Sequence, residues 1–286
     1  MSDNTTPPQD VADALALARH WGLDRLDAHL LLGHLLQQSR TWLLAHGDAP
    51  LPLALAQAFV ETCRRLADGQ PLAYLLGQRE FHGLMLTVTP DVLVPRPDTE
   101  TLVDWALEVL ATLLTPTPQV LDLGTGSGAI ALAMAHRHPA AHITATDASP
   151  AALAVARANA QRLGLAVRWA CGDWWQALDP AQHFELVLSN PPYIAADDPH
   201  LPALRHEPRA ALVPEDDGSA GQGLSALRRI ITGAPARLAP GGWLLLEHGW
   251  TQAAAVHSAL RQAGFGQIST RADIEGRPRC TGGQYG

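Results

Sequence analysis

The chain has few cysteines, no paired-cysteine motif and no excess of basic residues. Cys63, Cys171 and Cys280 are odd in number among 286 residues and widely spaced, so the sequence suggests neither a disulfide framework nor a zinc site. A reducing cytoplasm fits this pattern. The formal net charge of −8 and the pI near 5.9 disfavour a surface that follows a phosphate backbone. Nucleic acid is therefore not expected as a direct substrate.

Long hydrophobic runs and a secretory leader are also missing. The first ten residues, MSDNTTPPQD, lack a basic start and an apolar stretch, and no later apolar run approaches the roughly 20 residues of a membrane helix. We expect a soluble, unsecreted protein without a membrane partner. The composition, with 47% hydrophobic and 17% charged residues, is typical of a globular protein, and the length suits one large domain or two smaller ones.

The first quarter of the chain has a helical pattern. Apolar residues recur at spacings of three and four in VADALALARHWG, DRLDAHLLLGHLLQ and PLALAQAFVETCRRLA, which predicts a small helical bundle. After it, residues 81–88 look extended, and Asp98 or Thr99 is a candidate cap for a helix that ends near Leu114. We interpret residues 1–76 as a helical substrate-recognition domain, 77–97 as a linker or hairpin, and 98–286 as the catalytic domain.

The remainder alternates strand, turn and helix. QVLDLG, HITATD, AVRWACGD, FELVLSN and GGWLLLEHG are apolar runs, most of them followed by helical segments, which predicts an α/β fold with a doubly wound, mainly parallel, Rossmann-like sheet. Ligands of such sheets bind at the carboxyl ends of the strands. The long irregular stretch 207–223 is a candidate loop over that site.

The first strand of this half ends in a glycine-rich turn, LDLGTGSGA. Gly124, Thr125, Gly126, Ser127 and Gly128 would let a ligand approach the following helix without a side chain in the way, although tight packing alone also explains such a turn. The spacing GxGxG, rather than GxGxxG, disfavours a dinucleotide.

Acidic residues end the next two strands. Asp147 is a candidate acceptor for both ribose hydroxyls, and the alternative is a helix N-cap, for which Ser149 competes. Asp173 and Trp174 are candidates to bind the amino group and the face of a purine, although the tryptophan would also serve as core filling. Together with the glycine turn, these residues favour S-adenosylmethionine over NAD as the cofactor.

The fourth strand ends in SNPPYI, residues 189–194, which resembles the signature of methyltransferases that act on planar nitrogens. Such a nitrogen is a poor nucleophile until acceptors hold its N–H groups. The Asn190 side-chain oxygen and the Pro191 carbonyl are the candidate acceptors, Pro192 adds no competing donor, and the Tyr193 ring would lie on the flat group. Asn190, Pro191 and Tyr193 are the candidate catalytic residues. The plain alternative is a proline turn that ends a strand.

Further segments, LVPRPDTETLV, the stretch from SNPPYI to GSAGQGL, and LLLEHGW, closely resemble the bacterial release-factor glutamine N5-methyltransferases, the HemK-like family. The resemblance runs from about residue 70 to about 265. It implies S-adenosylmethionine as methyl donor, the glutamine of the GGQ loop in class 1 peptide release factors as acceptor, and cofactor contacts at 124–128, Asp147, Trp174 and Asn190. It implies substrate contacts at Asn190, Pro191, Pro192 and Tyr193.

Some residues near these motifs have open roles. Arg96, Asp98 and Glu100 either shape the rim of the site or form an Asp–Arg scaffold pair, and Glu247 and His248 support the site or the strand. The chain closes with RCTGGQYG, which contains the substrate tripeptide. We interpret this tripeptide as a coincidence within a final edge strand, and self-methylation is the alternative.

Two other functions compete with this hypothesis. An adenine-N6 methyltransferase of DNA or RNA would also use an NPPY motif, but it would need a basic surface to hold a flipped base. A catalytically silent cofactor-binding scaffold would not need Asn190 and Tyr193.

Overall fold

The structure is a computed structural model that describes residues 6–215 and 222–286. It divides into two compact units, Met1–Gln78 and Arg79–Gly286, each of which has its own core. Every helix within the described ranges is too short or too polar to cross a lipid bilayer.

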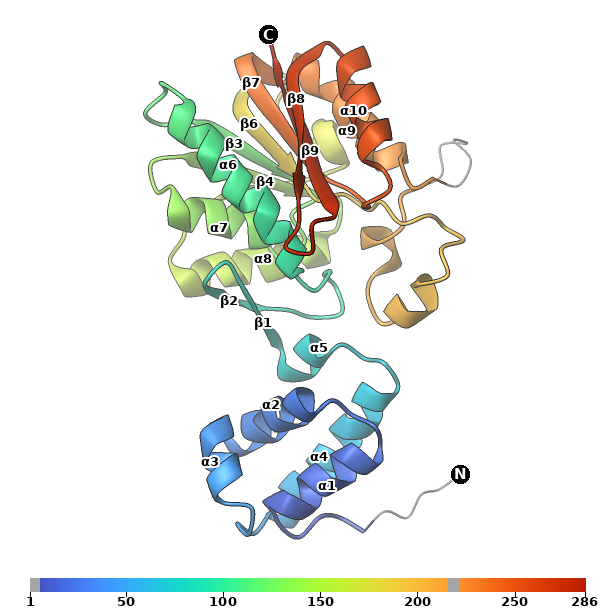
Figure 1. Cartoon of the computed structure of the whole chain (residues 1–286). Coiled ribbons are helices and arrows are strands. Elements are labelled where there is room, and N and C mark those ends of the chain that lie inside the picture. Colours follow the sequence, from blue (N-terminus) through green and yellow to red (C-terminus); the bar gives the residue numbers. More distant parts are fainter. Residues whose placement is uncertain (1–5, 216–221) are drawn as a thin grey trace. The chain divides into compact units, whose positions relative to one another are not determined.

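The first unit is all helical, as predicted (Figure 1). Its core contains Val11, Leu31, Leu43 and Phe59, all of which are buried. Asp10, the N-cap of the first helix, accepts a hydrogen bond from the Asp13 N–H at 2.8 Å. Two further helices, outside the three segments with a helical pattern, are only six and five residues long, too short to show a period of 3.6 residues. The five helices are α1 (Val11–His20), α2 (Arg25–Leu36), α3 (Arg40–Ala45), α4 (Leu53–Ala67) and α5 (Leu72–Leu76).

A hairpin precedes the first helix of the second unit. The stretch that the sequence predicts as extended forms two strands, β1 (Gln78–Phe81) and β2 (Leu84–Thr87), joined at His82 and Gly83. Both turn residues have positive φ angles, 50° and 82°, as in a two-residue hairpin turn of type I′. Helix α6 (Glu100–Thr112) follows a short 3-10 turn at Pro97–Thr99, close to its predicted bounds.

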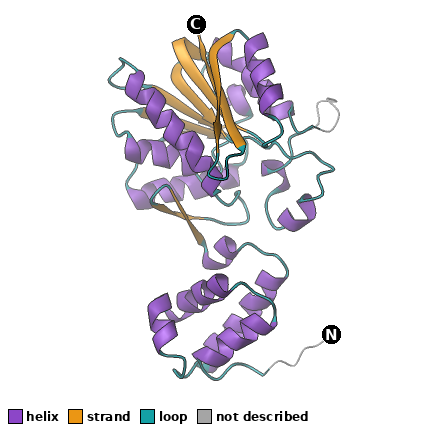
Figure 2. Ribbon diagram, viewed as in Figure 1, coloured by secondary structure: helices purple, strands orange, loops and turns teal. Residues whose placement is uncertain are grey.

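The centre of the second unit is a seven-stranded sheet with the order β5-β4-β3-β6-β7-β9-β8 (Figure 2). Strands β3 to β7 are parallel to one another, while β9 is antiparallel to both β7 and β8. The predicted doubly wound, mainly parallel fold is therefore confirmed. The elements are β3 (Gln119–Leu123), α7 (Ala129–Arg137), β4 (His142–Asp147), α8 (Pro150–Leu163), β5 (Arg168–Cys171), β6 (Phe184–Ser189), α9 (Ser225–Gly233), β7 (Leu238–Glu247), α10 (Ala253–Gln262), β8 (Phe265–Ala272) and β9 (Pro278–Tyr285).

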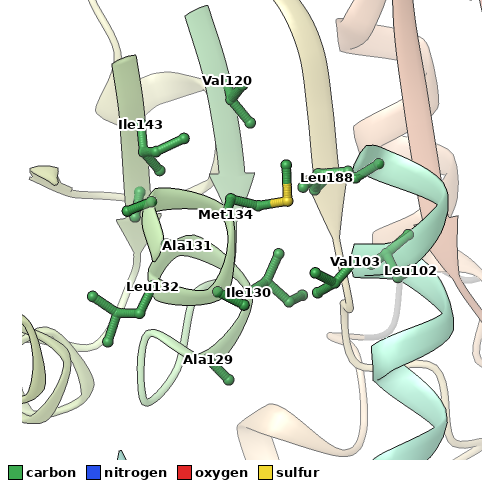
Figure 3. Close-up of a cluster of buried hydrophobic side chains, with 14 of the residues drawn as sticks. Leu102, Val103, Val120, Ala129, Ile130, Ala131, Leu132, Met134, Ile143 and Leu188 are labelled. Carbon is green, nitrogen blue, oxygen red and sulfur yellow. The ribbon is translucent and has the colours of Figure 1, made fainter. Parts of the chain in front are cut away.

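Alternate strand residues pack on opposite faces of the sheet. Val120 belongs to the core beneath α6, α7 and α8, whereas its neighbour Leu121 belongs to the core beneath α9 and α10. In the first of these cores, Met134 and Ile130 of α7 lie between the strands and α6 (Figure 3). Both faces of the central strands are thus covered, which explains why their sequences are mostly apolar.

The last strand corrects one prediction. We expected the C-terminal segment to form an edge strand, but β9 lies between β7 and β8, and β8 takes the edge. Gly282 is required there, because a Cβ at that position would come within 2.4 Å of Leu245 Cδ2 and 2.6 Å of the Leu244 carbonyl oxygen. Strand order depends on contacts between distant segments, so the final position in the chain did not indicate the final position in the sheet.

Candidate functional site

A large cavity lies at the carboxyl ends of β3, β4 and β6, within the second unit. Its volume is about 910 Å³, and its lining includes residues 124–127 of the glycine turn, Asp147, Asp173, Trp174 and Asn190, but not Gly128. The structure therefore brings together residues that the sequence places over almost 70 positions, as expected for strand ends in a doubly wound sheet.

The glycine turn adopts backbone angles that favour glycine. Gly124, Gly126 and Gly128 have φ angles of 72°, 56° and 86°, which side-chain-bearing residues rarely adopt. A Cβ on Gly128 would lie 3.1 Å from Leu132 Cδ1 and 3.2 Å from Ala156 Cβ, whereas nothing lies within 4 Å of a Cβ on Gly126. Tight packing thus accounts for Gly128, while Gly126 borders open space in the cavity lining.

Asp147 ends β4 and lies against this turn. One carboxylate oxygen accepts from the Gly126 N–H at 2.9 Å and the other from the Ser149 N–H at 2.8 Å. Helix α8 is capped by Ser149, whose hydroxyl oxygen accepts from the Ala152 N–H at 3.1 Å. The N-cap alternative for Asp147 is therefore wrong. Burial raises its pKa, and the backbone N–H groups oppose this effect.

Asp173 and Trp174 follow β5 and also line the cavity. Asp173 forms an ion pair with Arg229 of α9, so its carboxylate is held at the cavity wall. Trp174 packs against the second core and against the turn, where its ring would lie 3.2 Å from a Cβ on Gly124. Trp174 fills space beneath the turn and also contributes to the lining, and its contact with a purine face stays a prediction.

Asp122 is a buried carboxylate that sequence reasoning missed. Its Oδ2 accepts from the Thr125 hydroxyl at 2.6 Å and from the Ala131 N–H at 3.2 Å, which ties β3 to the turn and to α7. Burial raises its pKa to about 7, and the nearby charge of Asp147 acts in the same direction. A charged residue inside the apolar run VLDLG was the available signal.

The NPPY segment contributes to the lining of the large cavity and to that of a smaller one of about 230 Å³. Asn190 lines both cavities, and Pro191 and Tyr193 line the smaller one together with apolar residues such as Leu93 and Leu212. The Asn190 Nδ2–H donates to the Thr99 hydroxyl oxygen at 3.1 Å. No residue within 6–215 or 222–286 is found bonded to the Asn190 side-chain oxygen, which leaves that oxygen as an acceptor. The segment does more than end a strand.

A buried polar network lies behind Tyr193. The Tyr193 hydroxyl donates to Glu247 Oε1 at 3.1 Å, and burial raises the pKa of both groups, that of Glu247 to about 7. Nearby, the Arg279 guanidinium contacts Asp98 at 3.2 Å and Asp273 at 2.9 Å. Sequence reasoning missed Arg279 and Asp273, because nothing local marks a residue in β9 as a neighbour of the NPPY segment.

Arg96, Asp98 and Glu100 were expected either to shape the rim of the site or to form an Asp–Arg scaffold pair, and the second expectation is correct in part. Asp98 does pair with an arginine, Arg279. Arg96 pairs instead with the buried Glu207, whose second oxygen accepts from the Val94 N–H at 3.1 Å. Glu100 accepts from the His82 N–H at 3.0 Å and so anchors the hairpin.

His248 has a structural role in β9 packing. The ring is buried, and its Nε2 lies 2.7 Å from the Thr281 hydroxyl. Of the predicted loop at 207–223, residues such as Ala211 and Pro214 line the large cavity, while 216–221 lie outside the described residues.

The cavity fits S-adenosylmethionine. The carboxylate at the end of β4 offers acceptor oxygens beside the turn, the open face of Gly126 allows close approach of a ligand, and Trp174 offers an aromatic wall. In the described ranges, no group of three or more His, Cys, Asp or Glu side chains is arranged to hold a metal ion.

Comparison with known proteins gives matches over both units. The family described as "Methyltransferase small domain" matches residues 99–206, and "PrmC N-terminal domain" matches residues 11–77. A protein of Bordetella pertussis named "Release factor glutamine methyltransferase" is 52% identical over 264 residues, 92% of this chain and 95% of the relative. One of the same name from Burkholderia pseudomallei is 48% identical, covering 98% of this chain and 99% of the relative.

Among solved structures, a methyltransferase from Pyrococcus furiosus has a TM-score of 0.52 at 19% identity, over 71% of this chain and 90% of that chain. At this identity the likeness concerns the fold alone.

Proposed function

The chain belongs to the release factor glutamine methyltransferase family, and from this premise we propose that its two cavities bring S-adenosylmethionine and the GGQ glutamine of a class 1 release factor together at Asn190. The protein is a methyltransferase that uses S-adenosylmethionine. The observation that carries the proposal is that Asn190 lines both cavities while its Nδ2–H is bonded to Thr99.

We assign cofactor binding to the large cavity. Gly124, Thr125, Gly126, Ser127 and Gly128 would border the bound molecule. Asp147 would accept from its ribose hydroxyls, and Asp173 and Trp174 would contact its adenine. When bound, the cofactor supplies an electrophilic methyl group on a sulfonium.

The smaller cavity suits the acceptor. A glutamine side chain is short and uncharged, and its amide group is flat, in keeping with the mostly apolar lining near Tyr193 and Leu212. Asn190 Oδ1 and the Pro191 carbonyl would accept the two amide N–H bonds, and the Tyr193 ring would cover the amide plane. These contacts oppose delocalisation of the nitrogen lone pair and orient it for attack.

The chemical step needs no strong base. The bound cofactor would supply its methyl carbon to the amide nitrogen and its sulfur would leave as a thioether, while Asn190 and the Pro191 carbonyl would hold the N–H groups of that nitrogen. The nitrogen then carries a positive charge and releases one of its protons to water. Tyr193 is poorly suited as a base, since burial raises its pKa and its hydroxyl donates to Glu247.

We assign recognition of the rest of the release factor to the helical domain, residues 1–76. A free glutamine would make the same contacts with Asn190, Pro191 and Tyr193 but would lack the binding energy of the surrounding protein. It should therefore react far more slowly than the whole factor.

The test offers labelled S-adenosylmethionine to the enzyme with a release factor and with DNA and RNA in parallel. We expect one added methyl on the GGQ glutamine by mass spectrometry, and no labelling of a factor in which alanine replaces that glutamine. Label on adenine with none on the factor would favour the adenine-N6 methyltransferase instead.

A further inference from the structure

A buried carboxylate fastens one wall of the smaller cavity. Three parts of the second unit line that cavity: the 93–96 segment, the NPPY segment with the residue after it, and the chain between Leu204 and Leu212. Glu207 lies within the last of these, and only 2% of its side chain is exposed. A carboxylate buried to this extent needs hydrogen-bond donors, because the desolvation of a charge is costly.

Both oxygens of Glu207 are bonded to the 93–96 segment. Oε2 accepts from the Val94 N–H at 3.1 Å, and Oε1 accepts from the Arg96 guanidinium. Val94 is buried, whereas 36% of the Arg96 side chain is exposed. The carboxylate thereby joins two of the three parts that line the cavity, although more than a hundred positions separate them in the sequence.

The residues that follow Glu207, 208–212, form a wall of the cavity. They contain a single 3-10 turn, Arg209–Ala211, and Ala211 and Leu212 line the cavity. The Leu212 carbonyl accepts from the Ile194 N–H at 2.9 Å. The wall is therefore held at one end to the NPPY segment and at the other, through Glu207, to the 93–96 segment.

We propose that Glu207 is a positioning residue for the acceptor: by holding the 208–212 wall to Val94 and Arg96, it keeps the smaller cavity shaped for a glutamine side chain beside Asn190. This inference rests on the proposed function, which places the acceptor in that cavity. Glu207 is not among the described residues that line either cavity, so it acts through the wall and not by touching the substrate.

The cofactor should depend less on this wall than the acceptor does. The contacts that we assign to the cofactor, at the glycine turn, Asp147 and Asp173, follow β3, β4 and β5. From the wall, Pro208, Ala210 and Ala211 line the large cavity, and their side chains are small and apolar. A displaced wall should therefore change acceptor binding and leave the polar contacts of the cofactor in place.

The ion pair also neutralises Arg96, which lines both cavities. Methyl transfer moves a positive charge from the sulfonium to the acceptor nitrogen. An unpaired guanidinium at the edge of both cavities would repel this charge, whereas a paired one has little net effect. Removal of Glu207 thus has two consequences, a displaced wall and an unpaired cation, which a double variant can separate.

The experiment measures methylation of a release factor by the full-length wild-type enzyme, E207A and R96M. E207A removes both bonds of the carboxylate and should lower kcat/KM for the factor about 10- to 100-fold, the range for a misplaced reacting group. R96M removes one of the two bonds and keeps an unbranched side chain, so its loss should be smaller. The Kd of S-adenosylhomocysteine should change less than about threefold in both variants, since the hydrogen bonds of the cofactor remain.

The matched control is E185A. Glu185, near the start of β6, also accepts from a backbone N–H, that of Gln119 at 2.6 Å, but it lies at the end of the strand away from the cavities. E185A should leave kcat/KM unchanged. Thermal unfolding of every variant shows whether it is folded.

Two further comparisons test the shape of the cavity itself. A short peptide with GGQ at its centre should lose the same factor of kcat/KM in E207A as the whole release factor, because both place the glutamine in the smaller cavity. R96M/E207A should be no faster than E207A, because the wall stays displaced when the cation is removed.

An unchanged kcat/KM in folded E207A would overturn the proposal. A loss that R96M/E207A restores would overturn it as well, because the unpaired charge of Arg96 would then be the cause. The proposal would also fail if the factor but not the peptide were affected, or if the Kd of S-adenosylhomocysteine rose as much as kcat/KM fell. If E207A does not fold, R96M decides, and a normal kcat/KM in that variant would contradict the proposal.

These outcomes leave the proposed function intact, because the wild-type enzyme would methylate the factor in each of them. A wild-type enzyme that does not methylate the factor would instead contradict the proposed function.

Discussion

Replacing Asp147 by alanine should weaken cofactor binding without unfolding the protein. In the structure, this carboxylate accepts one backbone N–H on each oxygen, from Gly126 at 2.9 Å and from Ser149 at 2.8 Å. These bonds leave lone pairs on both oxygens for the ribose hydroxyls of a bound cofactor. D147A would therefore remove the ribose contacts and also loosen the turn that borders the cavity.

The magnitude follows from the charge of the acceptor. Hydrogen bonds to a charged group contribute about 1.5–3 kcal/mol, which corresponds to roughly a 10- to 150-fold rise in the Kd. D147N should lie between the wild type and D147A, because its amide keeps one acceptor oxygen but turns its NH₂ group toward one of the two backbone donors.

The assay is calorimetric titration with S-adenosylhomocysteine, with thermal unfolding measured on each variant. D104A is the matched control, since Asp104 is an exposed carboxylate that contacts His82 on the hairpin, outside the cavity lining. An unchanged Kd in folded D147A would remove Asp147 from the binding site, and an equal loss in D104A would point to a nonspecific charge effect.

Three further changes test other parts of the structure. N190A should lower the methylation rate about 100-fold or more through loss of an oriented acceptor, and a normal rate in a variant that binds both ligands would contradict its assigned role. G282A should lower the free energy of unfolding by about 1–3 kcal/mol through overpacking, whereas G266A, where a Cβ would meet only the Gln284 carbonyl oxygen at 4.0 Å, should not. The folded protein holds the Asp122 proton up to about pH 7 and the unfolded chain only to about pH 4. The free energy of unfolding should therefore fall as the pH rises from about 4 to about 7, by up to about 1.4 kcal/mol per pH unit. Denaturant titrations should show a flatter dependence on pH for D122N.

The sequence predicts the candidate site well where a polar side chain stands at the end of a predicted strand. Asp147 and Asn190 each follow an apolar run directly, and the fold class alone places such positions at one edge of the sheet. The glycine turn is equally local, because its positive φ angles require residues that the sequence shows directly. These features therefore needed no knowledge of distant contacts.

The residues that support the site could not be found in this way. Arg279 lies almost 90 positions after Asn190, and it reaches the network only because β9 inserts between β7 and β8. Thr99 looked like a helix cap, and its position did predict the start of α6, but its hydroxyl is directed to Asn190 and not to the helix. A side chain's partner depends on packing between segments, which local patterns do not encode.

The C-terminal tripeptide is a second case in which a local pattern does not reveal how its residues pack. Gly282, Gly283 and Gln284 have the letters of the substrate motif, yet each has a packing reason in β9. A Cβ on Gly283 would lie 3.0 Å from the Gly266 carbonyl oxygen, and the Gln284 side-chain N–H donates to the Gly241 carbonyl at 2.8 Å. To enter the smaller cavity, Gln284 would have to leave this bond and strip β9 from both neighbouring strands. Self-methylation within the folded chain is therefore disfavoured, because it would cost two strand pairings. We expect the enzyme to keep its intact mass when it is incubated with the cofactor alone.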